Sequence, residues 1–292
     1  MWRAAYYIFY AINRIITLLP LGVLYLFSDF LFLLLYYFPS YRRKIVAENL
    51  SKSFPDKSPE EIRHIERAFY RHLSDLFIET LKLPGMSNKE LSRRVKLTNP
   101  ELIGKLYDSG KDLAVVFSHF NNWEWLTTVF QLYTDYKCVG VYKPVKNKIV
   151  NKFLNDQRTR NKGGLAPMQM IVRTIVENRK MGIRGIYGFM SDQTPARTLI
   201  EYYTDFLNQE TPVFLGLEKI ASKYDMAVMF IDYRKIRRGS YEITFEVLFE
   251  STKDLPQYLI TDTHVKRLEK MIMDKPENWI WTHRRWKYKK ET

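Results

Sequence analysis

A histidine and a glutamate stand five residues apart in the stretch Ser-His-Phe-Asn-Asn-Trp-Glu-Trp at residues 118–125. On a continuous helix this spacing would separate His119 and Glu124 by about 140° around the axis, so the two would not face each other. They can meet if His119 lies in a strand-to-helix turn and Glu124 in the first helical turn, with Asn121 or Asn122 as the N-cap. The carboxylate would then fix the imidazole tautomer and leave the other ring nitrogen as a general base. Such a pair needs no serine or cysteine nucleophile when the substrate supplies its own hydroxyl.

The alternative interpretation is a polar turn in which the histidine caps a helix and the glutamate is solvated.

The predicted helices and strands determine where this motif lies in the fold. Strand-like apolar runs alternate with segments of helical periodicity, which predicts a largely parallel sheet covered by helices. Ser58 and Pro59 are typical of a helix start. We expect helices at 62–83, 123–133, 148–160, 168–179, 212–223 and 261–273, and strands at 112–117, 138–142, 183–190, 226–233 and 241–249. The fold class is therefore α/β.

The N-terminal segment is too apolar for an ordinary soluble helix. Between residues 15 and 38 the only polar residues besides tyrosines are Thr17, Ser28 and Asp29, and a spanning helix needs about 20 apolar residues. Pro20 should break or kink this helix. The run is too long for a cleavable signal peptide, and Tyr-Arg-Arg-Lys at 41–44 favours a cytoplasmic location for the rest of the chain. We expect residues 1–40 to be a membrane anchor, either spanning or re-entrant, and residues 41–292 to be one domain. A buried core helix is the alternative.

Composition excludes several classes of protein. The 292 residues carry a net charge of +14, which suggests an anionic partner such as a membrane surface. The mean hydropathy of −0.31 excludes a polytopic transporter. A single cysteine excludes an intramolecular disulfide framework. The chain has no Gly-rich phosphate loop, no His-Glu-x-x-His helix and no Gly-x-Ser-x-Gly elbow, so we expect no cofactor and no metal. The basic residues are interleaved with acidic ones, which argues against nucleic acid as the partner.

Four further blocks follow the His-x4-Glu motif in order. They are Val-Tyr-Lys-Pro at 141–144, Met-Ser-Asp-Gln at 190–193, Asp-Phe-Leu-Asn with Thr-Pro at 205–212, and Trp-Ile-Trp-Thr-His-Arg-Arg-Trp-Lys at 279–287. Together these blocks closely resemble those of the bacterial lipid A late acyltransferases, in the glycerolipid acyltransferase superfamily. Two positions depart from the family pattern. Lys143 stands where arginine is usual, and Asn208 replaces a glycine, although asparagine also tolerates a positive φ.

The resemblance implies transfer of a fatty acyl chain from an acyl carrier protein thioester to a hydroxyl of a lipid A precursor. His119 would be the general base and Glu124 would orient it. The residues implied to bind substrate are Asn122, Lys143, Arg158, Asp192, Gln193, Arg284 and Arg285. The implied location is the bacterial inner membrane, with the catalytic domain on the cytoplasmic face. The resemblance also implies a glycerolipid acyltransferase-like fold.

Two rival functions remain open from the sequence. One is an acyltransferase of the same superfamily that acts on a glycerophospholipid, a phosphoinositide mannoside or an amino-acid lipid. The other is a basic membrane-binding or nucleic-acid-binding protein without catalytic activity. The dispersed basic residues and the C-terminal tryptophan-rich block argue against these rivals.

Overall fold

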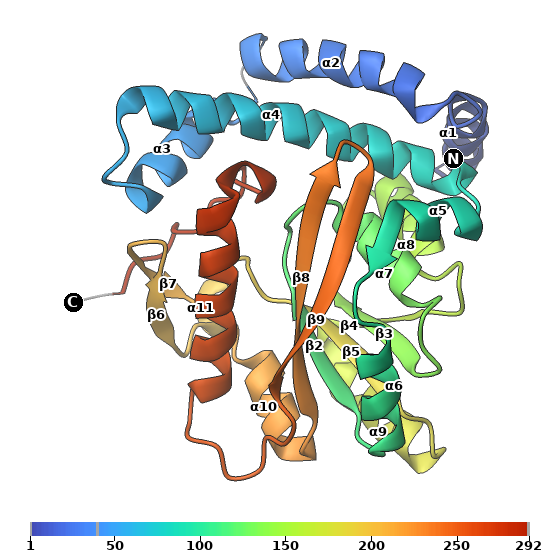
Figure 1. Ribbon diagram of the computed structural model, residues 1–292, viewed down its shortest axis with the longest axis vertical. Helices are drawn as coiled ribbons and strands as arrows, with labels where there is room; N and C mark the ends of the chain where they lie inside the picture. The colour runs from blue at the N-terminus through green and yellow to red at the C-terminus, as the bar shows by residue number, and fades with distance from the viewer. Residues whose placement is uncertain (1, 39–40, 291–292) are drawn as a thin grey trace.

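The apolar runs pair as a seven-stranded sheet in the computed structural model, which describes residues 2–38 and 41–290 (Figure 1). The strand order is β1 (Val95–Leu97), β9 (Ser240–Phe249), β8 (Ala227–Arg237), β2 (Leu113–Phe117), β5 (Gly185–Met190), β3 (Lys137–Tyr142) and β4 (Gly164–Pro167). Strands β8 and β9 are antiparallel, and the other neighbours are parallel. The prediction of a mostly parallel sheet covered by helices is therefore confirmed.

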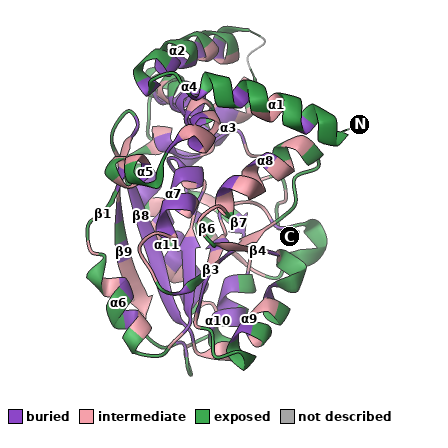
Figure 2. Cartoon of the chain, turned by 90° about the vertical axis from the view of Figure 1, so that its right-hand side faces the viewer, coloured by how far each residue is buried: buried purple, intermediate pink, exposed green. Residues whose placement is uncertain are grey.

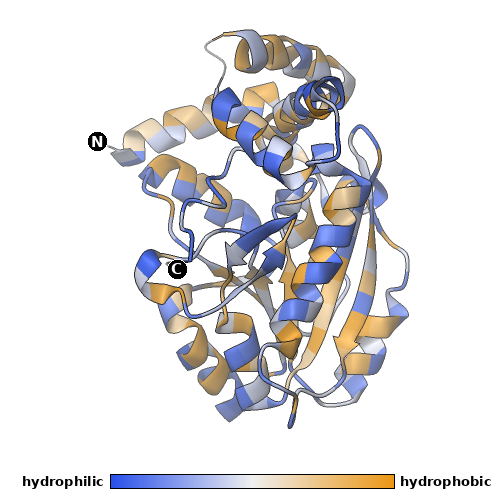
Figure 3. Cartoon of the chain, turned by 90° about the vertical axis from the view of Figure 1, so that its left-hand side faces the viewer, coloured by the Kyte–Doolittle hydropathy of each residue, from blue (hydrophilic) through white to orange (hydrophobic). Residues whose placement is uncertain are grey.

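Side chains alternate between two cores on the faces of this sheet. Leu113 and Val115 join one buried cluster, and Ala114 and Val116 join the other, because successive residues of a strand point to opposite faces. The first cluster includes residues of α5 (Asn88–Arg94), α6 (Glu101–Asp108) and α7 (Trp123–Phe130). The second includes residues of α9 (Ile171–Lys180), α10 (Gly216–Tyr224) and α11 (Leu259–Asp274). Figure 2 shows the resulting buried sheet, and Figure 3 its hydrophobic strands.

Helix α4 (Pro59–Lys82) lies across the carboxyl end of the parallel strands (Figure 1). Helix α4 begins at Pro59 with Ser58 as its N-cap, as predicted from the sequence. The Ser58 side chain accepts a hydrogen bond from the Glu61 backbone, and the Glu61 side chain accepts one from the Ser58 backbone. This capping box satisfies two backbone donors, and Pro59 has no N–H to leave unpaired. Helix α4 thereby begins at a fixed residue and covers the edge of the sheet where parallel strands place their functional loops.

Two helices, α1 (Trp2–Ile16) and α2 (Leu21–Tyr37), form the apolar N-terminal segment. Pro20 separates them as expected, and their axes differ by 116°. Taken singly, neither helix is both long and apolar enough to cross a bilayer, whereas the bent pair passes that test by length and composition. One face of α2 packs on α4, and the other exposes large apolar side chains such as Leu26, Phe27 and Phe30.

Some elements differ from the sequence-based expectations. The helix expected at 212–223 begins only at Gly216, because Pro212 ends strand β7 (Gln209–Pro212), which pairs with β6 (Tyr203–Phe206). The other unpredicted elements are α3 (Arg43–Ser53), α5, α6 and the edge strands β1 and β4. Helices α5 and α6 and the two edge strands span eight residues or fewer, too few for a clear period. Helix α8 (Lys148–Arg158) packs against α1 and α7. Single 3-10 turns lie at Leu83–Gly85, Met168–Met170, Arg197–Leu199 and Pro276–Asn278.

Candidate active site

His119 and Asp192 meet at the carboxyl edge of the sheet. Phe117 of β2 pairs with Met190 of the parallel neighbour β5, and each functional residue follows two positions later. His119 Nδ1 lies 2.8 Å from Asp192 Oδ1, and the His119 backbone N–H donates to Asp192 Oδ2 at 2.9 Å. Trp279 Nε1 donates to the same Oδ2 at 2.8 Å. The imidazole is therefore held by a carboxylate that itself accepts three hydrogen bonds.

The charge on Asp192 sets the tautomer of His119. Burial opposes ionisation of Asp192, but the His119 ring and the donated hydrogen bonds outweigh it, so the pKa of Asp192 lies below its usual value. An ionised Asp192 only accepts, so Nδ1 carries the proton and Nε2 keeps its lone pair. Gln193 Nε2 lies 3.2 Å from that Nε2. The His119 side chain is 19% exposed and Asp192 is fully buried, so a substrate can reach only the histidine.

The C-terminal tryptophan-rich block builds the loop that carries Asp192. His283 Nε2 accepts a hydrogen bond from the Thr194 backbone N–H at 3.1 Å, and the Thr194 hydroxyl donates to the Arg285 carbonyl at 2.5 Å. Burial lowers the pKa of His283 to about 4, which keeps this ring neutral and able to accept. Trp279 is a site residue that reasoning from the sequence missed. Its membership of the C-terminal block was the available signal.

Glu124 binds Arg158. Arg158 donates from Nη2 and Nε to the two Glu124 carboxylate oxygens at 2.6 and 2.9 Å. Trp123 Nε1 donates to Glu124 Oε1 at 3.0 Å, and the Trp123 ring lies edge-on to the His119 ring with centroids 5.0 Å apart. Within the described residues no hydrogen bond joins Glu124 to His119. Burial lowers the pKa of Arg158, but Glu124 outweighs this effect, so the pKa is raised overall. The bidentate geometry holds the guanidinium in one orientation.

The remaining expected site residues lie in different settings. Asn122 is buried and caps α7 by accepting from the Trp125 backbone, as predicted for an N-cap, and it donates to Glu79 of α4. Lys143 is exposed just after β3. Arg284 is exposed, whereas Arg285 is buried and donates to the Pro212 carbonyl at 2.7 Å. Burial lowers the pKa of Arg285 to about 10.

Ser118 lies between the end of β2 and His119. Strand β2 ends at Phe117, and Ser118 lines a small pocket together with Asp192, the partner of His119. The Ser118 hydroxyl is buried and has no hydrogen-bond partner in the described part of the chain. In residues 2–38 and 41–290 no group of three or more His, Cys, Asp or Glu side chains converges on a metal position.

A family model described as bacterial lipid A biosynthesis acyltransferase matches residues 2–288 of this chain. The matched range includes the helices at the N-terminus, both loops of the His119 site and the C-terminal tryptophan-rich block. A search among curated proteins found no match.

Proposed function

Because the chain belongs to the bacterial lipid A biosynthesis acyltransferase family, we propose that it transfers a fatty acyl group from acyl carrier protein to a hydroxyl of a lipid A precursor, with His119 as the general base. The observation that carries this proposal is the hydrogen bond from His119 Nδ1 to Asp192, which leaves Nε2 as the basic atom. This role for Asp192 differs from the sequence-based expectation, in which Glu124 held the imidazole. Asp192 was then expected only to bind substrate.

The reaction proceeds by direct transfer. His119 Nε2 takes the proton of the acceptor hydroxyl as its oxygen attacks the thioester carbonyl, and the negative Asp192 stabilises the imidazolium that forms. The tetrahedral intermediate collapses with cleavage of the carbon–sulfur bond, and the leaving thiolate accepts the proton from His119. An acyl-serine intermediate is not part of this scheme, because the acceptor supplies the attacking hydroxyl and, within the described residues, no hydrogen bond joins the buried Ser118 hydroxyl to a base.

Glu124 acts through Arg158 in this scheme. A guanidinium fixed by two hydrogen bonds presents its remaining donors in a defined plane, which suits a phosphate oxygen or the oxyanion of the intermediate. Lys143, exposed at the end of β3, adds a flexible positive charge near the same edge of the sheet. Gln193 would exchange its contact with His119 Nε2 for the acceptor hydroxyl. Arg284, exposed beside the Asp192 loop, is a second candidate for an acidic group of the substrate.

The substrate enters from a membrane in this proposal. The exposed apolar residues of α1 and α2 would lie in the lipid, with α4 between them and the site. Asn122 connects α4 to the site, because it caps α7 and donates to Glu79 of α4 at 2.6 Å. This arrangement would bring an acceptor embedded in the bilayer to the carboxyl edge of the sheet. The carrier protein would approach from the cytoplasm.

The test uses purified full-length protein, an acyl carrier protein thioester with a labelled chain, and a lipid A precursor in neutral detergent. We expect His119→Ala to lower the rate by at least about 10²-fold, the lower range for general-base catalysis. His64→Ala is the matched control, since His64 is exposed on α4 and should leave the rate unchanged. Normal turnover by the His119→Ala enzyme, or an acyl adduct on Ser118, would refute the mechanism. Equal transfer to an unrelated alcohol would refute the proposal that a lipid A precursor is the acceptor.

A further inference from the structure

A cleft lined by four arginines lies at the tip of the β8–β9 hairpin, apart from the His119 site. Its walls are Arg93 and Arg94 at the end of α5 and Arg237, Arg238, Gly239 and Ser240 of the hairpin, and it encloses about 510 Å³. Arg237 follows Tyr233 by four residues along β8, and the Tyr233 carbonyl accepts from Asn121 in the catalytic loop. At about 3.3 Å per residue the cleft is about 13 Å further along the strand.

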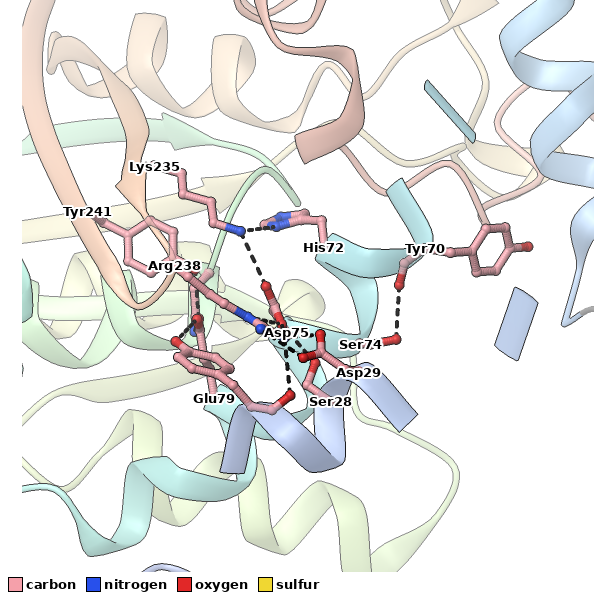
Figure 4. Close-up of polar contacts among 12 residues, drawn as sticks. Ser28, Asp29, Tyr70, His72, Ser74, Asp75, Glu79, Lys235, Arg238 and Tyr241 are labelled. Atoms are coloured by element: carbon pink, nitrogen blue, oxygen red, sulfur yellow. Dashed lines mark hydrogen bonds and ion pairs between the residues drawn. The ribbon is translucent and has the colours of Figure 1, made fainter. Parts of the chain in front are cut away.

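Two of the arginines are held in place by the protein. Arg238 Nη2 lies 2.8 Å from Asp29 Oδ1 of α2 and 2.6 Å from Asp75 Oδ1 of α4, and Figure 4 shows this cluster. The Arg238 guanidinium also lies over the Tyr25 ring, 4.2 Å from its centroid. Arg94 pairs with Glu90 at 3.0 Å. These contacts make the walls of the cleft rigid, but they also neutralise most of the charge of both arginines.

The other two arginines supply the charge available to a ligand. Arg93 and Arg237 are exposed, and in residues 2–38 and 41–290 neither guanidinium has a carboxylate partner. Their position in one concave site favours an anion that accepts several hydrogen bonds, and phosphate oxygens match guanidinium donors in this way. Gly239 maintains the shape of the turn. It has a φ of 69°, and an added Cβ would collide with the Tyr25 hydroxyl.

The surroundings of the cleft identify the kind of phosphate. Asp29 and Tyr25, which hold the hairpin, belong to α2, and the same helix exposes 68% of Leu26 and 61% of Phe30. Ile236 at the hairpin tip is 55% exposed. Apolar side chains that flank a basic cleft are the arrangement expected where a protein lies at a bilayer surface, with its arginines at the level of the headgroups.

We propose that this arginine cleft binds the headgroup phosphate of an anionic bilayer phospholipid and orients the enzyme on the membrane. The inference rests on the proposed membrane location but not on the acyl-transfer chemistry. The lipid bound there is a structural partner and is not the acceptor. Arg93 and Arg237 make the contacts to its phosphate, whereas Arg94 and Arg238 support the hairpin.

The experiment measures binding of full-length protein to vesicles of phosphatidylcholine alone and of phosphatidylcholine with one-fifth phosphatidylglycerol, at about 0.1 M salt. The Arg93→Ser/Arg237→Ser variant should bind the anionic vesicles about 30-fold more weakly, because each basic residue near an anionic surface contributes about 1 kcal/mol. The control is Lys105→Ser/Lys180→Ser. It removes the same charge from α6 and α9, at the end of the molecule away from α2 (Figure 1), and should change binding by less than about twofold.

Equal losses for both variants would overturn the proposal, because the attraction would then depend only on net charge. Unchanged binding by the Arg93→Ser/Arg237→Ser variant would overturn it as well. A second measurement, the KM for the lipid A precursor in neutral detergent, distinguishes the source of the phosphate. We expect that KM to stay within about twofold of wild type. A large rise in KM with unchanged vesicle binding would assign the cleft to the acceptor and would leave the proposed activity intact.

Discussion

Replacing Asp192 with asparagine tests whether the histidine depends on that carboxylate. Asp192 Oδ2 accepts from both the His119 backbone and Trp279, while Oδ1 accepts from His119 Nδ1. An asparagine has one oxygen, which satisfies the two donors at the Oδ2 position. Its NH2 group then faces Nδ1. This arrangement favours the tautomer with the proton on Nε2, the atom that must act as the base.

The expected loss is large, because the wrong tautomer removes the base and the neutral amide no longer stabilises the imidazolium. A similar replacement in a serine-protease triad costs about 10⁴-fold in kcat. Here we expect Asp192→Asn to lower kcat by about 10³-fold to 10⁴-fold with little change in KM for the acyl donor. Asparagine has nearly the same volume as aspartate, so the buried site should still fold.

The assay is the labelled acyl carrier protein thioester reaction, with kcat and KM measured from about pH 6 to pH 9 and the thermal unfolding midpoint as the control for folding. A folded Asp192→Asn enzyme with wild-type kcat would refute the reasoning. So would a loss confined to KM, because an orienting carboxylate acts on the chemical step. The acyl adduct should remain undetectable in either enzyme.

The remaining predictions concern Glu124 and a buried histidine. Glu124→Gln should lower the rate by about 10-fold to 10²-fold, because it leaves the Arg158 charge without its carboxylate, and the loss should multiply with that of Asp192→Asn in the double variant. If the double variant loses no more activity than Asp192→Asn alone, Glu124 acts through His119 and not through Arg158. Burial lowers the pKa of His264 to about 4, so the folded state keeps this ring neutral. The free energy of unfolding therefore keeps its full value above about pH 6.5. It decreases by on the order of 3 kcal/mol as the pH falls towards 4, because only the unfolded state then binds a proton at this ring. Thermal midpoints should therefore fall with pH less steeply in His264→Leu than in the wild type.

The sequence predicted that a histidine pairs with a carboxylate, but not which carboxylate. His119, Asp192 and Gln193 all belong to blocks noticed in the sequence, and His119 was expected in a strand-to-helix turn. The five-residue spacing favoured Glu124 as the partner of His119, whereas Asp192 is 73 residues away. Only the register of β2 against β5, which places Phe117 opposite Met190, brings His119 and Asp192 to the same level. Local spacing cannot reveal which parallel strands become neighbours, because the connections between them are long.

In the N-terminal segment, too, the sequence predicted some features and the tertiary structure decided others. Its apolar composition and Pro20 were enough to predict a segment unlike a soluble helix and broken near that proline. Folding decided the 116° bend and which side of α2 is buried. Ser28 donates to Asp75, and Tyr25 donates to Glu79, both at 2.7 Å, so these polar groups of α2 face α4 together with buried Leu24 and Phe32, whereas Leu26 and Phe30 face outward. A buried polar group must find a partner, and partners distant in the sequence become neighbours only in the folded chain.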